Sequence, residues 1–216
     1  MFTLNEWQEI IKPKEEILYN CSEFKFSNDE WVHFPIGMGY TFNNYNGDLK
    51  NVQIGTHANL VLCSINSKTD QRRRPRPKNR SSILATLSSN NIHNTYLNSN
   101  IYFNTLPSYK FIISPEGNGI DCHRHYEALM AGCIPIVEEH SGIREKYGNC
   151  PILYTNDYSE ISETYLEDKY KEMLETKYDF SKLLLSNYND TTKSEIISNG
   201  NYWGERCTCK KWYSNI

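Results

Sequence analysis

The sequence predicts a protein of the α/β class, in which helices cover both faces of a mainly parallel sheet. Short apolar runs alternate with longer amphipathic segments along most of the 216 residues. Within this alternation, residues 110–137 read as a strand, a glycine-bearing turn, a short helix and a second strand. A helical crossover of this kind joins parallel neighbours in a sheet, which indicates the class.

Apolar periodicity gives the approximate position of each element. Strands are expected near 17–19, 31–34, 60–65, 92–96, 110–114, 134–137 and 152–154. Helices are expected near 81–88, 101–106, 121–130 and 143–147, and residues 159–188, rich in Glu, Lys and Leu, predict two further amphipathic helices. Pro135 has no amide hydrogen for a sheet ladder, so we expect it among the first residues of its strand.

The turn after the fifth predicted strand carries the clearest functional signal. Gly117 and Gly119 lie within this turn, Asp121 stands where a helix N-cap is expected, and Gly132 is placed to end the helix. Ligands of parallel sheets bind beyond the carboxyl ends of the strands, which is where residues 114–120 are expected. Backbone amides at a helix N-terminus can receive phosphate oxygens there.

The helix adds a charged pair, Arg124 and Glu127. Residues three apart are neighbours on a helix surface, so the two side chains are expected to lie together. An arginine can bind a diphosphate through two hydrogen bonds, and a carboxylate can accept hydrogen bonds from the hydroxyls of a ribose. The pair therefore indicates a nucleotide-sugar site. The alternative is an ordinary ion pair on the protein surface.

This stretch resembles the signature of exostosin-like glycosyltransferases. The matching residues are Ser114, Pro115, Gly117, Asp121, Arg124, Glu127, Ala128, Leu129, Gly132, Cys133, Ile134 and Pro135. The resemblance covers residues 58–155 and implies the Rossmann-like, C-terminal donor-binding half of a GT-B glycosyltransferase. It also implies that Arg124 lies near the diphosphate of the donor and Glu127 near its ribose.

Two features depart from related patterns. Many retaining GT-B enzymes carry two glutamates that are closer in sequence than Glu116 and Glu127 are, which weakens the case for a retaining enzyme. The resemblance implies inversion at the anomeric carbon. The Gly-Asn-Gly of residues 117–119 also resembles protein O-glucosyltransferases of the CAP10 kind, which share the GT-B plan. The donor sugar therefore stays open.

Three regions are expected along the chain. Residues 1–57 would form a reduced acceptor-side segment, residues 58–190 a Rossmann-like nucleotide-sugar-binding domain, and residues 191–216 a tail that packs back on that domain. Complete GT-B enzymes have two Rossmann-like halves, as the resemblance implies, and the first region is too short for one. The chain is thus a minimal enzyme, a fragment, or a lobe that a second chain completes.

A basic run at residues 72–80 stands out against a net charge of −3. The net charge argues against a dedicated nucleic-acid binder. The prolines in this run exclude a helix, so it is expected as an exposed connection. One hypothesis is that it folds over an anionic ligand, with Arg80 aimed inward at the start of the next helix. A solvated loop and an RNA-binding or targeting segment are the alternatives.

The cysteines and histidines predict no metal centre. Seven scattered cysteines show no disulfide framework, and Cys207 and Cys209 have no further paired ligands nearby. His123 and His125 point in different directions on the predicted helix, so they cannot share a metal, and partly exposed rings are expected. No two aspartates are separated by a single residue, so the D-x-D metal motif of other glycosyltransferases is absent. We expect a metal-independent reaction without a cofactor.

The sequence thus predicts a glycosyltransferase that moves a sugar from a nucleoside-diphosphate sugar to a glycan or another hydroxyl acceptor. The expected substrate-binding residues are Arg80, Ser114, Glu116, Gly117, Gly119, Arg124 and Glu127. Arg124 is also expected to stabilise the leaving nucleoside diphosphate, while His33 and His57 are candidate bases that no spacing selects. The alternative is a non-catalytic sugar-nucleotide-binding lobe or partner subunit. No apolar run has the length of a membrane span and no leader is visible, so cytoplasmic residence is expected.

Overall fold

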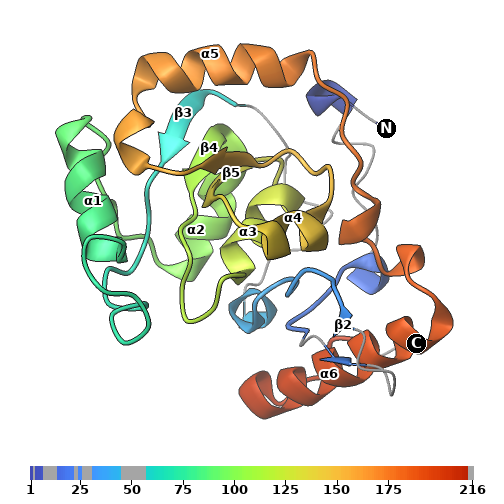
Figure 1. The fold of residues 1–216 in the computed structure, drawn as a ribbon. Coiled ribbons are helices and arrows are strands. Elements are labelled where there is room, and N and C mark those ends of the chain that lie inside the picture. Colours follow the sequence, from blue (N-terminus) through green and yellow to red (C-terminus); the bar gives the residue numbers. More distant parts are fainter. Residues whose placement is uncertain (2, 7–13, 22–23, 26–30, 45–56, 214–216) are drawn as a thin grey trace.

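A computed structural model describes residues 1, 3–6, 14–21, 24–25, 31–44 and 57–213. The centre of the protein is a four-stranded parallel sheet with the strand order β3-β4-β5-β6. Figure 1 shows α1 on one side of this sheet and α3 and α4 on the other, so the predicted α/β class is confirmed. The sheet strands are β3 (Asn59–Leu62), β4 (Tyr109–Ile113), β5 (Ile134–Glu138) and β6 (Leu153–Thr155), and the helices are α1 (Arg80–Ser89), α2 (Ser99–Thr105), α3 (His123–Met130), α4 (Ser141–Tyr147), α5 (Glu163–Leu174) and α6 (Asp190–Thr208).

The strands of the sheet are apolar on both faces. Parallel pairing places Val61 beside Phe111 and Ile136 beside Leu153. Phe111 and Ile136 are fully buried, as expected for strands that helices cover on both sides. Pro135 is the second residue of β5, which confirms its expected place near the beginning of the strand.

The strand expected at 92–96 is wrong. This segment runs beside the end of β3, but a single backbone hydrogen bond, from Thr95 to Cys63, and the side chain of Asn94 hold it there instead of a regular backbone ladder. The Asn94 amide group accepts from the amide of Ile65 at 2.9 Å and donates to the carbonyl of Ile65 at 3.1 Å. Asn91 has a left-handed φ of 62°, which turns the chain before the segment begins.

Residues 159–188 contain one α-helix, α5, and not the two that were expected. After α5 the chain forms short 3-10 turns at Ser181–Leu183 and Leu185–Asn187. The reason is visible in the burial pattern, because the buried side chains of Tyr178, Phe180, Leu183 and Leu185 do not follow a helical repeat.

The two N-terminal strands are also shorter than expected. Residues 17–19 form only isolated bridges, Ile17 with Leu184 and Tyr19 with Met38. The prediction at 31–34 is reduced to β2 (Trp31–Val32), which pairs in antiparallel fashion with β1 (Phe24–Lys25).

The N-terminal segment packs directly on α3. Met38 donates its amide hydrogen to the carbonyl of Leu18 at 2.8 Å. Gly37 has a φ of +80°, and a Cβ at this position would lie 2.5 Å from the Leu18 backbone, so only glycine fits between the two passes. The hydroxyl of Tyr126 on α3 accepts from the Leu18 amide at 2.9 Å and donates to the carbonyl of Leu183 at 2.6 Å. One buried hydroxyl therefore joins three parts of the chain.

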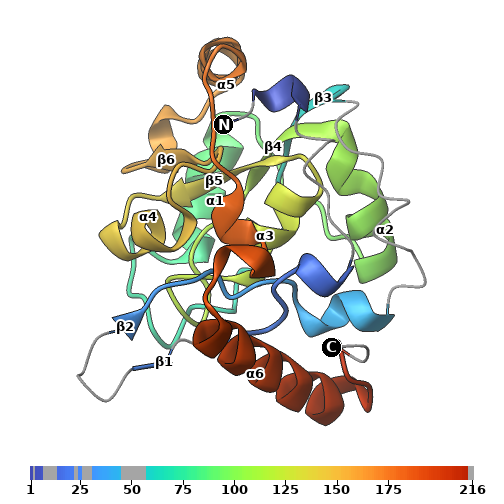
Figure 2. The ribbon, with the colours of Figure 1, turned by 90° about the vertical axis from the view of Figure 1, so that its right-hand side faces the viewer.

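Helix α6 packs against the same N-terminal segment, on the side away from the sheet (Figure 2). Tyr19 stacks on Trp212, with the ring centroids 4.1 Å apart. Gly200 allows the close approach, because a Cβ there would lie 2.8 Å from the Tyr19 carbonyl oxygen and 2.8 Å from the ring of Tyr213. None of the described helices combines the length and the apolar character of a membrane span.

The contact at Gly200 predicts an unusual response to alanine. Glycine to alanine within a helix normally stabilises it by about 1 kcal/mol, but here the added methyl group meets backbone. We expect Gly200→Ala to lower the free energy of unfolding by about 1–3 kcal/mol because of overpacking, measured by urea denaturation. Ser198→Ala, on the exposed side of the same helix, is the control and should be neutral or slightly stabilising. Equal behaviour of the two variants would contradict the packing described above.

Candidate functional site

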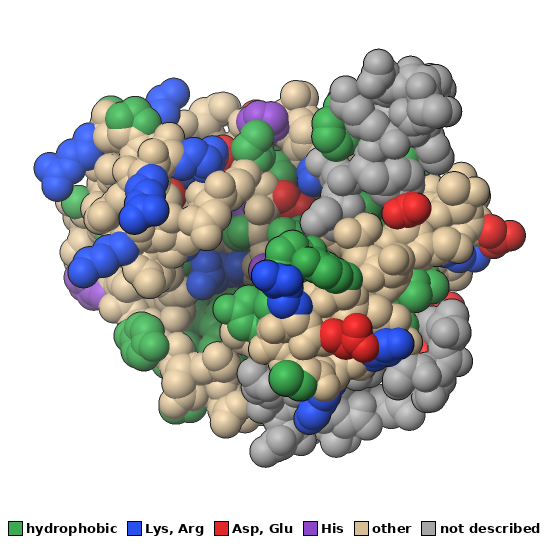
Figure 3. All heavy atoms as spheres, turned by 90° about the horizontal axis from the view of Figure 1, so that it is seen from below, with side chains coloured by type: hydrophobic (Ala, Val, Ile, Leu, Met, Phe, Trp, Pro, Cys, Tyr) green, Lys and Arg blue, Asp and Glu red, His purple; other side chains and the backbone are tan. Residues whose placement is uncertain are grey.

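The loops that leave the carboxyl ends of β3, β4 and β5 meet at one end of the molecule, where ligands of parallel sheets bind. Figure 3 views the protein from this end and shows a hollow that contains hydrophobic and basic side chains. The turn at 114–121, the start of α3 and the N-terminal segment all lie in this region. The site is therefore built from segments that are far apart in the sequence.

The start of α3 is one residue later than predicted. The N-cap is Cys122, which makes no capping hydrogen bond through its side chain. Asp121, the expected cap, instead accepts hydrogen bonds from the amide of Ile36 at 2.9 Å and from the hydroxyl of Tyr147 at 2.8 Å, and it lies 3.6 Å from Lys146. Its carboxylate thus joins the N-terminal segment to α4. The helix ends before Gly132, which has a φ of +73°, as the sequence predicts.

Arg124 extends from the first turn of α3 toward the end of β3. Its Nη2 donates to the carbonyl of Ser64 at 2.9 Å, and its guanidinium lies 5.8 Å from the centre of the Tyr102 ring. The Nε atom is buried and finds no hydrogen-bond partner in the part of the chain that the structure describes. Burial alone would lower the pKa of Arg124, but the neighbouring Tyr102 and Cys122 outweigh it and raise the pKa. The Arg124 guanidinium is therefore a positive charge held by Ser64, and its Nε donor is not used by any described residue.

Glu127 lies one turn further along α3 and faces the N-terminal segment. Its side chain is buried, and burial raises its pKa, although His123 and Arg124 oppose this shift. A Cβ at Gly39 would lie 2.8 Å from the Glu127 Oε1 atom, so the segment passes very close to the carboxylate here. His123, on the same side of the helix, contacts the carbonyl of Gly37 through Nδ1 at 2.9 Å.

Arg124 and Glu127 line one cavity of about 200 Å³. Tyr102 also lines this cavity, and its hydroxyl, like the Arg124 Nε atom, is buried without a hydrogen-bond partner among the described residues. Buried polar groups are normally paired, so these two atoms mark places where a ligand or water can bind. The other lining residues are Thr41, Ser64, Ile65, Asn66, Tyr96, Leu97, Ser99 and Phe103.

Arg80 is buried and aimed inward, as expected, but its partners are backbone carbonyls. Its Nε donates to Glu116 at 2.8 Å and its Nη2 to Pro115 at 2.9 Å. A Cβ at Gly117 would lie 3.1 Å from the Arg80 Nη2 atom. Burial, and then the positive charge of Arg124, lower the pKa of Arg80. Arg80 thus holds the turn at 115–117 in place through hydrogen bonds to its backbone.

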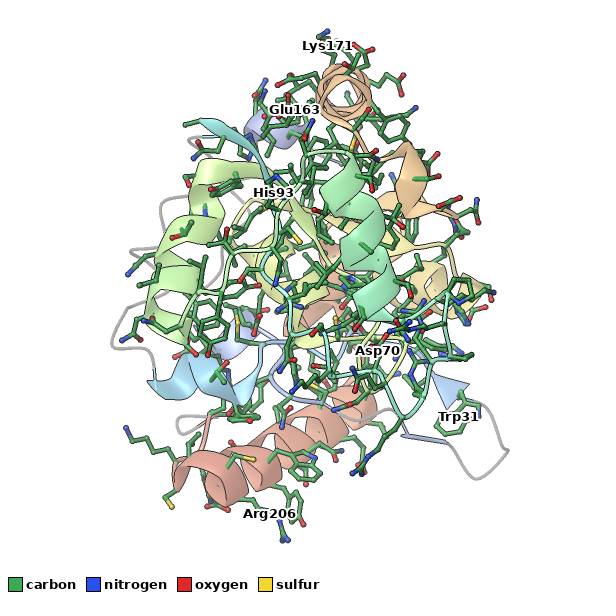
Figure 4. The ribbon with its side chains drawn as sticks, turned by 90° about the vertical axis from the view of Figure 1, so that its left-hand side faces the viewer. Trp31, Asp70, His93, Glu163, Lys171 and Arg206 are labelled. Carbon is green, nitrogen blue, oxygen red and sulfur yellow. The ribbon has the colours of Figure 1, made fainter. Side chains whose placement is uncertain are left out.

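The basic loop that precedes Arg80 folds around Asp70. The Asp70 carboxylate is fully buried and accepts from the amide of Arg80 at 2.9 Å, and Arg74 lies 3.8 Å away. Figure 4 shows Asp70 among the nitrogen-rich side chains of this loop. Arg74 also donates to Glu138 at 2.7 Å, whereas Arg72 is exposed. The loop is thus held to the protein at Asp70 and Arg74, whereas its residue Arg72 is exposed to solvent.

Ser114 is buried at the end of β4. Its amide donates to the carbonyl of Ile136, and its hydroxyl lies 2.7 Å from the His125 Nδ1 atom. His125 is itself fully buried, so the partly exposed ring expected from the sequence is wrong at this position. The thiol of Cys122 lies 3.6 Å from both ring nitrogens. Burial alone would raise the pKa of Cys122, but His125 lowers it, and the same pairing raises the pKa of His125 despite burial.

Glu116 and Gly119 lie in two other cavities. Glu116 pairs with Arg73 and lines a cavity of about 620 Å³ together with Glu138 and His140. Gly119 lines a third cavity, of about 540 Å³. Of the seven expected binding residues, the structure therefore brings Arg124 and Glu127 together in one cavity. Gly117 belongs to the turn itself, Arg80 supports that turn through its backbone carbonyls, and Ser114 is buried at the end of β4.

The two candidate bases lie apart from the cavity that Arg124 lines. His57 is at the amino end of β3, where Nε2 contacts the carbonyl of Gly132 at 2.6 Å and Nδ1 contacts the Tyr170 hydroxyl. Burial lowers its pKa. His33 lies 3.3 Å from Glu145 and lines the third cavity. In the described part of the chain, no three His, Cys, Asp or Glu side chains are grouped to hold a metal ion.

Sequence reasoning missed Tyr102 and Tyr96 as site residues. Both come from the region between β3 and β4, for which the sequence predicted a strand and a helix but no functional residue. Neither residue belongs to a motif, so nothing in the local sequence distinguishes them from the many other tyrosines of the chain. Their place in the cavity depends on how α2 packs beside α3.

The contacts of Arg80 predict a structural role that stability measurements can separate from ligand binding. We expect Arg80→Ala to lower the free energy of unfolding by about 2–4 kcal/mol, because two carbonyls lose a charged donor inside the protein. Arg72→Ala, in the exposed part of the same loop, should change it by less than about 0.5 kcal/mol. Chemical denaturation of the two variants without ligand makes the comparison. Unchanged stability of Arg80→Ala would show that the turn does not depend on this side chain.

Comparison with known families adds independent information. The family model described as the RXYLT1 C-terminal domain matches residues 69–197, which is more than half of the chain and includes the turn, α3 and most of the sheet. No curated protein matches the chain. The chain therefore belongs to the RXYLT1 C-terminal domain family, an exostosin-like xylosyltransferase family, and is related to the glycosyltransferases.

Proposed function

We propose that the chain binds a nucleoside-diphosphate sugar in the cavity lined by Arg124 and Glu127, and that it transfers the sugar to a hydroxyl group of a glycan or another acceptor. One observation carries this proposal. A half-buried guanidinium, whose Nε atom has no hydrogen-bond partner among the described residues, and a buried carboxylate line the same cavity, at the carboxyl edge of a parallel sheet. The family supports the reaction class.

The electrostatics of the site favour an anionic ligand. Arg80 and Arg124 are close enough for the charge of Arg124 to lower the pKa of Arg80. A diphosphate near both guanidinium groups would relieve this repulsion, and Arg124 would donate hydrogen bonds to its oxygens. The same contact would stabilise the charge that develops on the leaving nucleoside diphosphate.

Glu127 would recognise the ribose. An ionised carboxylate is an acceptor only, so it suits the hydroxyl donors of a diol. A volume of about 200 Å³ is below the usual range for a complete ligand. The cavity would therefore hold the ribose and part of the diphosphate, while the base and the transferred sugar extend beyond it.

The family description makes a pentosyl donor the first one to test. The proposed reaction proceeds with inversion and without a metal ion, since Arg124 would supply the charge that balances the diphosphate.

A second candidate function is a binding lobe without catalysis. The observation that favours it is the crowding at the start of α3, where the Gly37 carbonyl contacts His123 and Gly39 passes close to Glu127. Such crowding would leave little room for an acceptor beside Glu127. Such a lobe would bind sugar nucleotides and act as a partner subunit.

Arg124 provides the central test of the proposal. We expect Arg124→Ala to weaken UDP or GDP binding by about 10-fold to 100-fold, the effect of losing a charge-assisted hydrogen bond. Isothermal titration calorimetry gives the affinities, and Arg72→Ala is the matched control with unchanged binding. Arg124→Lys keeps a positive charge at this position and should bind with intermediate affinity. It still tests the site if the alanine variant misfolds. Equal affinity in all four proteins would overturn the site.

Glu127 should control the preference for ribose over deoxyribose. In the parent protein UDP should bind more tightly than 2′-deoxy-UDP, and Glu127→Gln should reduce that preference because the amide is a weaker acceptor. Since burial raises the pKa of Glu127, the preference should fade on acidification at a higher pH than for an exposed carboxylate. Titrations of both nucleotides across the acidic range make the comparison, and a preference that is constant with pH would argue against a role for this carboxylate.

Catalysis itself is tested with sugar donors. An enzyme should show slow hydrolysis of at least one UDP- or GDP-sugar, because water can replace the acceptor, and release of the nucleoside diphosphate reports it. Arg124→Ala should abolish this release. Tight binding of a sugar nucleotide with no hydrolysis and no transfer would favour the binding lobe.

A further inference from the structure

We propose that Tyr96 forms a stacking platform for the nucleobase of the donor, at the mouth of the cavity lined by Arg124 and Glu127. This inference rests on the proposed function and adds a ligand contact to it. The ligand class is a nucleoside diphosphate whose base lies outside the cavity while its ribose and diphosphate lie within.

Tyr96 combines high exposure with a place in the cavity wall. Its side chain is 87% exposed, yet it lines the same cavity as Tyr102, which is 9% exposed. A single exposed aromatic residue is ordinary on a protein surface. This one shares its cavity with Tyr102 and Arg124, whose hydroxyl and Nε atom are buried and lack partners among the described residues. An apolar ring at the rim and unpaired polar groups inside match a ligand with an aromatic end and a polar end.

The segment that carries Tyr96 is anchored on both sides. Before it, Asn94 makes two hydrogen bonds with Ile65, and the amide of Thr95 donates to the carbonyl of Cys63 at 2.8 Å. After it, Asn98 caps α2 by accepting from the amide of Ile101 at 3.0 Å. A backbone that is already fixed loses little conformational entropy when a ligand binds. Tyr96 is thus held in place at the rim without being buried by the protein itself.

The size of the cavity determines which part of the ligand reaches Tyr96. About 200 Å³ accommodates a ribose and neighbouring phosphate oxygens, but not a base in addition. With Glu127 on the ribose and Arg124 on the diphosphate, the base must leave the cavity at its mouth. A tyrosine ring there can stack on any base, since every base presents a flat π face.

The test compares Tyr96→Ala and Tyr96→Phe with the parent protein, using UDP, GDP and inorganic diphosphate as probes in calorimetric titrations. We expect Tyr96→Ala to weaken UDP and GDP about tenfold, the usual effect of losing one stacking partner. Tyr96→Phe keeps the ring and should bind within about twofold of the parent, because stacking does not need the hydroxyl. Inorganic diphosphate, which has no base, should bind equally to all three. Tyr202→Ala, an exposed tyrosine on α6, is the matched control.

The outcomes separate this inference from the proposed function. If Tyr96→Ala binds UDP as tightly as the parent while Arg124→Ala does not, the platform is wrong and the donor site stands. If Tyr96→Ala weakens a UDP-sugar but not UDP, the ring contacts the transferred sugar, which also overturns the platform. If the parent binds neither UDP nor GDP, the proposed function fails and this inference fails with it. If inorganic diphosphate binds too weakly to measure, the UDP affinities of Tyr96→Ala, Tyr96→Phe and the parent protein decide whether the ring stacks on the base.

Discussion

The arrangement of the site depends on the carboxylate of Asp121. It stands at the head of α3 and accepts hydrogen bonds from the Ile36 amide and the Tyr147 hydroxyl, so it fixes the N-terminal segment and α4 against the same end of the sheet. A charged acceptor inside a protein must be fully paired, which makes this geometry specific. Because Ile36 is held in place, the segment that follows it passes close to Glu127 at Gly39, so the surroundings of this carboxylate depend on a residue far away in the sequence.

Two arginines that look equivalent in sequence have different surroundings. Arg80 satisfies its donors with the carbonyls of the 115–116 turn, and it belongs to the support of the site. Arg124 donates a hydrogen bond to Ser64, and its Nε atom has no hydrogen-bond partner among the described residues. The difference follows from their neighbours, since Arg80 begins α1 next to the turn, whereas Arg124 extends from α3 along the wall of a cavity. Two neighbouring cations, one buried and one half-buried, leave an electrostatic cost that a diphosphate can offset.

The parts of the fold that the sequence predicted best are those in which local and tertiary preferences agree. The apolar runs of β4 and β5 are longer and more continuous than the other strands, and the glycine-bearing turn between them is unambiguous, so this crossover was placed correctly. The segment at 92–96 has strand-like composition but lies beside β3 through the side chain of Asn94, which no periodicity reports. Helix α6 was expected only as a tail, since the Gly200 that allows its packing weakens the helical signal.

By itself, the sequence determined the α/β class, the position of the turn after β4 and the neighbouring placement of Arg124 and Glu127, because each of these follows from spacing along one or two elements. The tertiary structure alone decided which groups surround them. It buried Ser114 and His125 in the core, paired Arg80 with the backbone of the turn, brought Tyr96 and Tyr102 to the cavity, and placed Gly39 beside the Glu127 carboxylate. The physical reason is that burial and pairing depend on contacts between distant segments, and a linear pattern records only the preferences of each segment.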